Sequence, residues 1–304
     1  MFIPRAIPLT LAAALSVSLL PQASAAPSVA EIQRQVNDLR EEAASKYEAA
    51  NAVKYQISKL QSQLNGLKQG EAAANAKATA LQNEISKLAI ENYKNGGLGN
   101  GLTLMLSRDP ARYLSDAAIL DVIAQRYSTK LRQLKSYKQG LQSTQLVVSD
   151  RTTQLQAAQK NLEKQVAAAN AALAKATKLL ASLKAEERAK LLAADDADQA
   201  KILAESKRLA ALYAGGSTRG AIALRYALNQ VGDIYVWGGA GPTKWDCSGL
   251  TMRAFGSAGV SLPHSAAVQY NYGKYIPRSA LAPGDLVFFG RPISHVAIYL
   301  GKGK

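Results

Sequence analysis

The most constraining feature of this chain is a stripe of apolar residues that recurs at alternating steps of four and three. Such alternation is the 3.5-residue repeat of a left-handed coiled coil, in which one seam faces a partner helix. Abundant Ala, Gln, Lys, Glu and Leu favour the same structure. The stripe, in which only Lys46 is polar, predicts one helix from about Val29 to about Tyr93 and comprises Ile32, Val36, Leu39, Ala43, Lys46, Ala50, Val53, Ile57, Leu60, Leu64, Leu67, Ala74, Ala78, Leu81, Ile85 and Leu88.

A glycine-rich segment at 95–101 ends this pattern, because each of its four glycines costs about 1 kcal/mol in a helix. Asp109-Pro110 then begins a second helix, since proline suits a first turn. Its stripe runs from Leu120 to Leu183, and every seventh position from Lys138 to Gln159 is polar. The second stripe comprises Leu120, Ala124, Tyr127, Leu131, Leu134, Lys138, Leu141, Gln145, Val148, Thr152, Leu155, Gln159, Leu162, Val166, Ala169, Leu173, Ala176, Leu180 and Leu183.

Two long helices with one apolar seam each predict an antiparallel coiled-coil hairpin over residues 28–212, with its break near 95–110. One interpretation is a spacer or dimerisation rod. The other is an interaction arm whose tip, residues 98–113, carries apolar side chains for a partner. The helix is expected to continue to Tyr213, and the acidic cluster at 195–198 fits a solvated helix face better than a metal site.

The N-terminus predicts export from the cytoplasm. Arg5, an apolar run of about twelve residues and Ala23-Ser24-Ala25 resemble a secretory signal peptide over residues 1–25. The net charge is +15, from 37 basic and 22 acidic residues, which favours an anionic partner. Export favours a cell-wall polymer over nucleic acid, so no nucleic-acid partner is expected. Cys247 is the only cysteine, so no internal disulfide is expected.

The amino-acid composition changes after a linker at 213–218, because glycine, proline and aromatic residues become frequent again. Residues 219–304 predict a small α+β domain, with helices first and the strands 286–289 and 295–300 after. Within it, Asp246 suits a helix N-cap, which places Cys247 in the first turn. Backbone N–H groups there stabilise a thiolate and can hold an oxyanion. Cys247 is therefore a candidate nucleophile.

Two histidines could serve as its base, and they are the only two in the chain. His295 begins an alternating strand, from which an imidazole can reach a neighbouring helix. His264 lies in a turn or helix start, a place more typical of a residue that lines a substrate site. We favour His295, although a base must lie within hydrogen-bond reach of the thiol, which sequence leaves open.

These residues belong to five short motifs that together resemble the NlpC/P60 family of papain-like cysteine peptidases from bacterial cell walls. The resemblance covers roughly residues 219–304. The motifs, in chain order, are Tyr235-Val236-Trp237-Gly238-Gly239, Asp246-Cys247-Ser248-Gly249-Leu250, Leu262-Pro263-His264-Ser265, Pro283-Gly284-Asp285-Leu286-Val287-Phe288-Phe289 and His295-Val296-Ala297-Ile298-Tyr299.

The resemblance implies a peptidoglycan endopeptidase that needs no cofactor or metal, with Cys247 as nucleophile and His295 as base. Tyr235, Asp246, Ser248 and, as a lining residue, His264 are the expected substrate-binding residues. The family typically cleaves between D-glutamate and the following diamino acid of a stem peptide. The helical arm resembles those of division-associated wall hydrolases, which dock on a membrane ABC-type complex and restrain the enzyme.

One departure from the family pattern opens alternatives. A third residue that orients the histidine is expected near position 307, beyond Lys304, so residues 219–304 form an incomplete family domain. A catalytically silent wall-binding or activator protein is therefore the second hypothesis. A third keeps the Cys/His chemistry in an amidase or acyltransferase. The leading hypothesis remains a secreted wall hydrolase.

Overall fold

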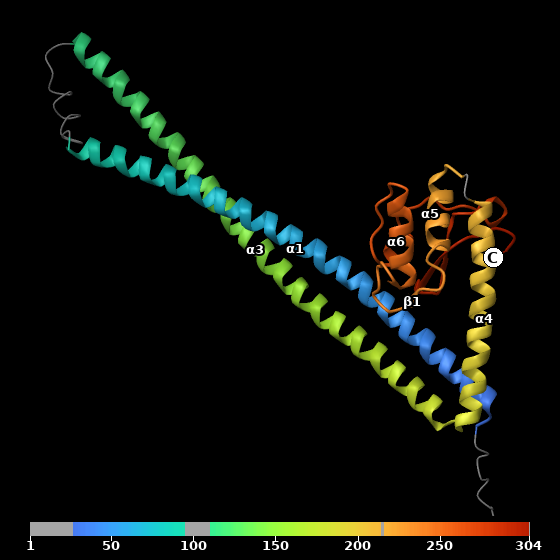
Figure 1. Ribbon diagram of the computed structural model, residues 1–304. Helices are drawn as coiled ribbons and strands as arrows, with labels where there is room; N and C mark the ends of the chain where they lie inside the picture. The colour runs from blue at the N-terminus through green and yellow to red at the C-terminus, as the bar shows by residue number, and fades with distance from the viewer. Residues whose placement is uncertain (1–26, 95–109, 214–215, 304) are drawn as a thin grey trace, which may run out of the picture.

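The computed structural model describes residues 27–94, 110–213 and 216–303, without the side chains of 110–117, 119, 120 and 210. Two helices, α1 (Val29–Lys94) and α3 (Pro110–Ser182), form a long arm (Figure 1). A third, α4 (Ala185–Leu212), leads back to the C-terminal domain, which lies between α4 and α1. The predicted signal peptide, the glycine break and most of the predicted tip fall outside the described residues.

The stripe predicted for the first helix is confirmed at every position. Each of its sixteen members is buried or half-buried in α1. Near the N-terminal end Ile32 and Val36 pack against Ala176 and Leu183 of the returning chain. Farther along, residues 53–60 of α1 pack against residues 155–162 of α3. The two helices therefore run antiparallel, and apolar burial along their seam holds them together.

The second stripe is correct in period but wrong at alternate positions. Lys138, Gln145, Thr152 and Gln159 are exposed, so the four predicted polar positions lie outside the seam. The half-buried or buried positions in that register are the preceding residues, which include Thr144, Arg151 and Ala158. An α-helix turns through 3.6 residues, so a 3.5-residue stripe drifts around it and the neighbouring residue takes over.

The predicted seam also fails at Ala124, which is exposed, and at Leu131, which is 51% exposed. Figure 1 shows the physical reason, because α1 and α3 cross and then diverge toward the end of the arm. Near that end Lys130 of α3 still forms an ion pair with Glu84 of α1. This ion pair thus still links the two helices where they begin to separate.

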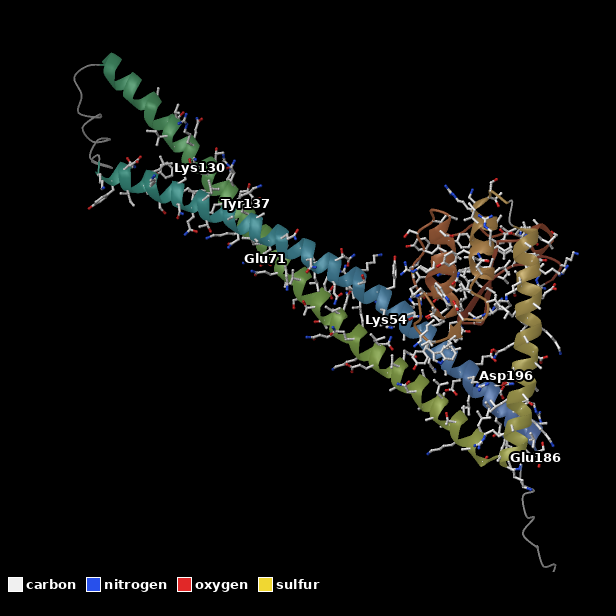
Figure 2. The ribbon with its side chains drawn as sticks, viewed as in Figure 1. Lys54, Glu71, Lys130, Tyr137, Glu186 and Asp196 are labelled. Atoms are coloured by element: carbon white, nitrogen blue, oxygen red, sulfur yellow. The ribbon has the colours of Figure 1, made fainter. Side chains whose placement is uncertain are left out.

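The chain turns sharply at Leu183 and Lys184, so α4 is a separate helix. Glu186 and Glu187 occupy its first turn, where their charge complements the helix dipole. The predicted solvated face is confirmed, because residues 195–198 are all exposed (Figure 2, Asp196). Within the described ranges, no group of three or more His, Cys, Asp or Glu side chains converges as a metal site requires.

The C-terminal domain pairs two helices through small side chains. Helix α5 (Arg219–Leu228) begins at Thr218, whose hydroxyl accepts the Ala221 N–H. It packs against α6 (Cys247–Ser257) through alanines, and the short α7 (Ala266–Gln269) follows. The alanines allow close approach of the helix backbones, with Ile298 packed against the same cluster.

The strands of this domain form two small pairs. The predicted antiparallel pair is confirmed as β3 (Leu286–Phe289) and β4 (His295–Ile298), in a register that aligns Phe289 with His295. A parallel pair that the sequence did not predict, β1 (Ile234–Tyr235) with β2 (Lys244–Trp245), precedes α6. A one-turn 3-10 helix, η1 (Arg278–Ala280), leads into β3. The domain's mixture of helices and short strands is as expected.

We expect Leu60→Ala to destabilise the arm, because Leu60 is 6% exposed within the α1–α3 seam. Truncating a buried leucine costs about 2–5 kcal/mol, so the free energy of unfolding should fall by about 2–3 kcal/mol in so thin a core. Leu146→Ala is the matched control, since Leu146 is 74% exposed on α3. Urea unfolding followed by circular dichroism should separate them, and equal stabilities would contradict the observed seam.

Candidate active site

Cys247 lies at the first position of α6, as the sequence predicts. Asp246 caps the helix, because its carboxylate accepts the Gly249 N–H at 2.6 Å. Gly249 is required there, since a Cβ would collide with the Gly239 carbonyl oxygen and meet His264 Nε2 at 3.0 Å. Cys247 is buried at 6% exposure, in a cluster with Ala266 and Val296. The thiol thus sits where free backbone N–H groups begin a helix.

Strand β4 begins at His295 and passes beside the thiol. The backbone of Val296, its neighbour in sequence, hydrogen-bonds the Cys247 side chain. The ring of His295 packs beside that of Phe289, with centroids 5.8 Å apart. Among the described residues, the thiol's side-chain hydrogen bonds go to partners other than His295. His295 is exposed, and no hydrogen bond joins it to the thiol in the part of the chain that the structure describes.

The expected substrate-binding residues surround the thiol. The Tyr235 hydroxyl hydrogen-bonds Cys247, and burial followed by the charges of Cys247 and Asp246 raises the pKa of this tyrosine. Ser248 is fully buried beside the nucleophile. His264 contacts Asp246 instead of Cys247, with Nε2 at 2.8 and 2.9 Å from the two carboxylate oxygens. His264 is therefore not placed as an alternative base for the thiol.

Helix α1 enters this site from outside the domain. The Glu48 carboxylate, whose residue is 3% exposed, lies 3.1 Å from Cys247 Sγ. It also accepts the Ser248 hydroxyl at 2.6 Å and the Ala266 N–H at 2.9 Å. Three donors of the C-terminal domain thus converge on one carboxylate of the arm.

Three neighbours of Glu48 on α1 complete what we call the docking face, defined as Tyr47, Glu48, Asn51 and Tyr55. Asn51 donates its amide to Asp246 at 3.0 Å. Tyr47 stacks on Trp237 with ring centroids 5.4 Å apart. The hydroxyl groups of Tyr55 and Tyr272 lie 3.1 Å apart. The docking face covers the thiol with mostly polar contacts.

The docking face also sets the charge state of the site. Burial raises the pKa of Cys247, and the charge and hydrogen bond of Glu48 raise it further. Burial lowers the pKa of His295, against the opposing influence of Glu48 and Glu41. A raised thiol pKa and a lowered imidazole pKa both favour neutral groups. While the docking face covers the site, both pKa shifts therefore disfavour the thiolate, which is the reactive form of Cys247.

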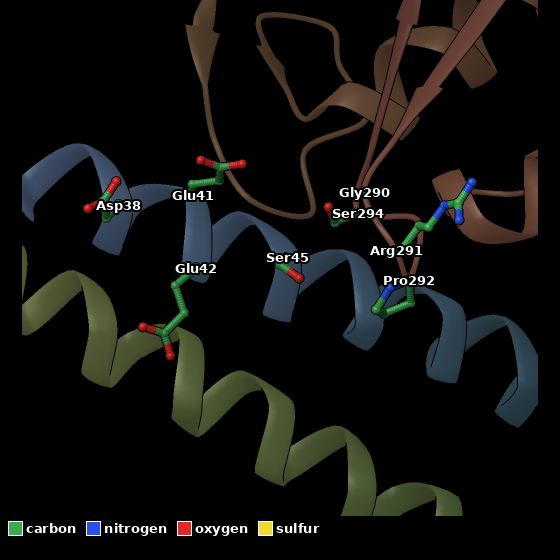
Figure 3. A pocket seen from close by; sticks show the side chains of 8 residues that line it. All are labelled: Asp38, Glu41, Glu42, Ser45, Gly290, Arg291, Pro292 and Ser294. Atoms are coloured by element: carbon green, nitrogen blue, oxygen red, sulfur yellow. The ribbon is translucent and has the colours of Figure 1, made fainter. Parts of the chain in front are cut away.

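A cavity of about 320 Å³ lies between α1 and the turn that joins β3 to β4 (Figure 3). The guanidinium of Arg291 points away from the carboxylates on α1. The charged groups thus do not converge on a single point. The lining residues are Asp38, Glu41, Glu42, Ser45, Gly290, Arg291, Pro292 and Ser294.

Sequence analysis missed the docking face entirely. Glu41, Glu48 and Tyr55 are seven residues apart, so they form a second stripe on α1 with the same repeat as the seam. A polar stripe on a helix normally indicates a solvated face, and nothing local distinguishes this one. The burial of Glu48 depends on a domain that begins about 170 residues later in the chain.

Comparison with known proteins assigns the part of the chain that contains this site. Residues 232–304 match the sequence profile of the NlpC/P60 family. The C-terminal part of this chain is an NlpC/P60 domain. Every expected site residue, from Tyr235 to His295, lies within the matched range. Members of this family are cysteine peptidases, which agrees with the buried thiol at the start of α6.

Several curated relatives match part of the chain. The match to "Probable endopeptidase p60" of Listeria monocytogenes is 50% identical over 80 residues, 26% of this chain and 16% of the relative. "Probable endopeptidase Rv2190c" of Mycobacterium tuberculosis is 47% identical over 88 residues, 29% of this chain and 23% of the relative. "Peptidoglycan endopeptidase RipA" of the same organism is 42% identical over 95 residues, 27% and 20% of the two chains. The chain thus covers under a quarter of the length of each of these relatives.

No helix in the described ranges combines the length and apolar character needed to cross a bilayer.

We expect Glu48→Gln to accelerate alkylation of Cys247 by iodoacetamide. Glutamine preserves the shape of the side chain but removes the charge that helps to raise the thiol pKa. The thiolate fraction rises about tenfold for each unit by which the pKa falls. Because the chain has one cysteine, the mass shift of the intact protein measures the reaction directly.

Glu42→Gln provides the matched control, because Glu42 is exposed on the same helix and is not among the groups that act on the thiol. Its alkylation rate should equal that of the unmodified sequence. Equal rates for Glu48→Gln and Glu42→Gln would show that the Glu48 charge does not suppress the thiol.

Proposed function

We propose that this protein is an exported cysteine endopeptidase that hydrolyses peptidoglycan stem peptides. The observation that carries the proposal is the buried thiol of Cys247, at a helix start beside β4, within residues that match the NlpC/P60 family. A papain-like arrangement of this domain, with the bond between D-glutamate and a diamino acid as the target, is part of the proposal. The predicted signal peptide supports action at the cell wall.

In the proposed reaction the Cys247 thiolate attacks the scissile carbonyl carbon. Backbone N–H groups at the start of α6 stabilise the oxyanion that forms. His295 accepts the thiol proton and donates it to the departing amine. Water, deprotonated by the same imidazole, then hydrolyses the thioester and regenerates the thiol. The chain's own residues supply each step, so the proposal includes no cofactor or metal.

We further propose that the helical arm, acting as a coiled-coil hairpin, regulates this activity. The docking face supports the idea, because Glu48 and Asn51 occupy the hydrogen-bonding groups of Cys247, Ser248 and Asp246. A substrate cannot reach the thiol while these contacts hold. Release by a membrane ABC-type division complex that engages the arm is the proposed trigger, and the arm itself is the part available to such a partner.

The covered thiol also bears on the alternative of a catalytically silent wall-binding protein. A silent protein gains nothing from a buried carboxylate that suppresses its thiol. The cost of burying Glu48 is understandable if a reactive thiol must be held inactive. We therefore favour a regulated enzyme, and product masses will separate an endopeptidase from an amidase or acyltransferase.

We expect Cys247→Ala to abolish release of stem-peptide fragments from purified muropeptides. Loss of the attacking group should reduce turnover by about 10³-fold or more. The assay belongs in the Glu48→Ala background, so that occlusion by α1 does not hide the difference. Mass spectrometry of the products identifies the bond, and equal turnover with and without the thiol would contradict a cysteine peptidase.

Glu48→Ala itself should raise turnover of the full chain. Hydrogen bonds to a charged group contribute about 1.5–3 kcal/mol each, and every 1.4 kcal/mol changes the released fraction about tenfold. Asn51→Ala should act in the same direction but less strongly, since it removes one neutral donor to Asp246. Glu42→Ala should leave turnover unchanged. A Glu48→Ala protein no more active than the unmodified chain would contradict regulation by the docking face.

A further inference from the structure

His264 forms a contact that neither the seam, the docking face nor the proposed reaction uses. Its Nε2 lies 2.8 and 2.9 Å from the two carboxylate oxygens of Asp246, within reach of both. Asp246 is buried at 2% exposure, whereas the His264 side chain is 25% exposed. A ring nitrogen that faces a carboxylate carries its proton and donates it. The contact is thus a donor from the domain surface to a buried anion.

The anion that His264 contacts joins two segments of the site. Asp246 caps α6 through the Gly249 N–H and accepts the Gly238 N–H at 2.8 Å. The first bond fixes the helix start that carries Cys247. The second fixes the loop that carries Tyr235 and its hydroxyl.

His264 also connects a third segment to this carboxylate. Its neighbour Ser265 is fully buried and caps α7, which presents the Ala266 N–H to the site. Behind it the buried Gln269 amide donates to the Ser248 and Pro263 carbonyl oxygens, each at 2.8 Å. The pair of His264 and Asp246 therefore links the start of α6 to the segment that carries α7.

We propose that His264 is a positioning residue that acts through Asp246 to hold the Cys247 helix start, the Tyr235 loop and the Ala266 segment in register. The inference rests on the proposed peptidase function, and it replaces the substrate-binding role expected for His264. Its importance increases on release of the arm, because Asn51 then withdraws its amide from Asp246. His264 remains as the nitrogen side-chain donor to this carboxylate.

The pair also has an electrostatic consequence for the nucleophile. The charge of Asp246 contributes to raising the pKa of Cys247, while His264 lowers the pKa of Asp246 against the larger opposing effect of burial. Removing His264 leaves the Asp246 charge uncompensated beside the thiol. Tyr235 is the other titratable group that interacts with the thiol once Glu48 is gone, and His295 lies on the adjoining strand β4. Both residues are retained when His264 is substituted, so they are present in every variant in which the pH dependence of Cys247 is compared.

The test uses the full chain with Glu48→Ala, into which His264→Ala, His264→Gln and His264→Arg are introduced. Arginine retains N–H donors in a geometry that suits a carboxylate, so it is the conservative replacement. We expect His264→Ala to lower kcat for muropeptide hydrolysis about tenfold or more, with KM changed less than about twofold. His264→Gln should fall between the two, and His264→Arg should restore kcat to within about threefold of the background.

Two further measurements separate positioning from a general loss of structure. The pH midpoint of Cys247 alkylation should rise in His264→Ala and return in His264→Arg, at temperatures well below the melting point of each variant. In an Asp246→Asn background, His264→Ala should have no additional effect on kcat, because the pair is already broken. Alkylation requires no peptidoglycan, so it tests the pair even if the proposed hydrolysis is absent.

The possible outcomes are distinct. A rise in KM with unchanged kcat would assign His264 to substrate binding and overturn the proposal. Failure of His264→Arg to restore either kcat or the alkylation midpoint would overturn it as well, as would additive effects of Asp246→Asn and His264→Ala. If His264→Ala does not fold, the comparison of His264→Gln with His264→Arg decides on the same criteria.

Discussion

A buried carboxylate must find hydrogen-bond donors, and the relation between the two parts of this protein depends on where Glu48 finds them. An ionised group removed from water without partners is severely destabilising. Glu48 meets the Cys247 thiol, the Ser248 hydroxyl and the Ala266 N–H, all from the C-terminal domain. The contact therefore fixes the position of the arm against the domain and covers the thiol at the same time.

Helix α1 contacts two parts of the protein, one through apolar side chains and the other through mostly polar ones. Toward α3 it presents an apolar seam, in which alanine, valine and leucine are buried along the arm. Toward the C-terminal domain it presents hydrogen bonds, one ring stack and a charge. Water can replace polar contacts at modest cost but cannot replace apolar burial. The difference suits an arm that stays intact while the domain is released from it.

Within the domain, a second buried carboxylate organises the site through three contacts of the domain itself. Asp246 caps α6, holds the loop of Gly238 and pairs with His264. Its position before Cys247 was predictable, because an aspartate ahead of an apolar helix is a common N-cap. Its pairing with His264 was not, since 17 intervening residues have no local rule that returns one side chain to the other.

The sequence by itself determined the buried face of the first helix and the class of the C-terminal domain. A repeat of 3.5 residues specifies the buried face of α1, and five motifs specify the domain, because both depend on neighbours along the chain. Only the tertiary structure decided the register of the second stripe, the divergence beyond Leu131 and the burial of Glu48. Each depends on where another element lies in space. Glu48 and Glu42 are both glutamates on α1, and the sequence around them does not distinguish their roles. Glu48 covers the thiol only because the C-terminal domain, about 200 residues later in the chain, packs against it.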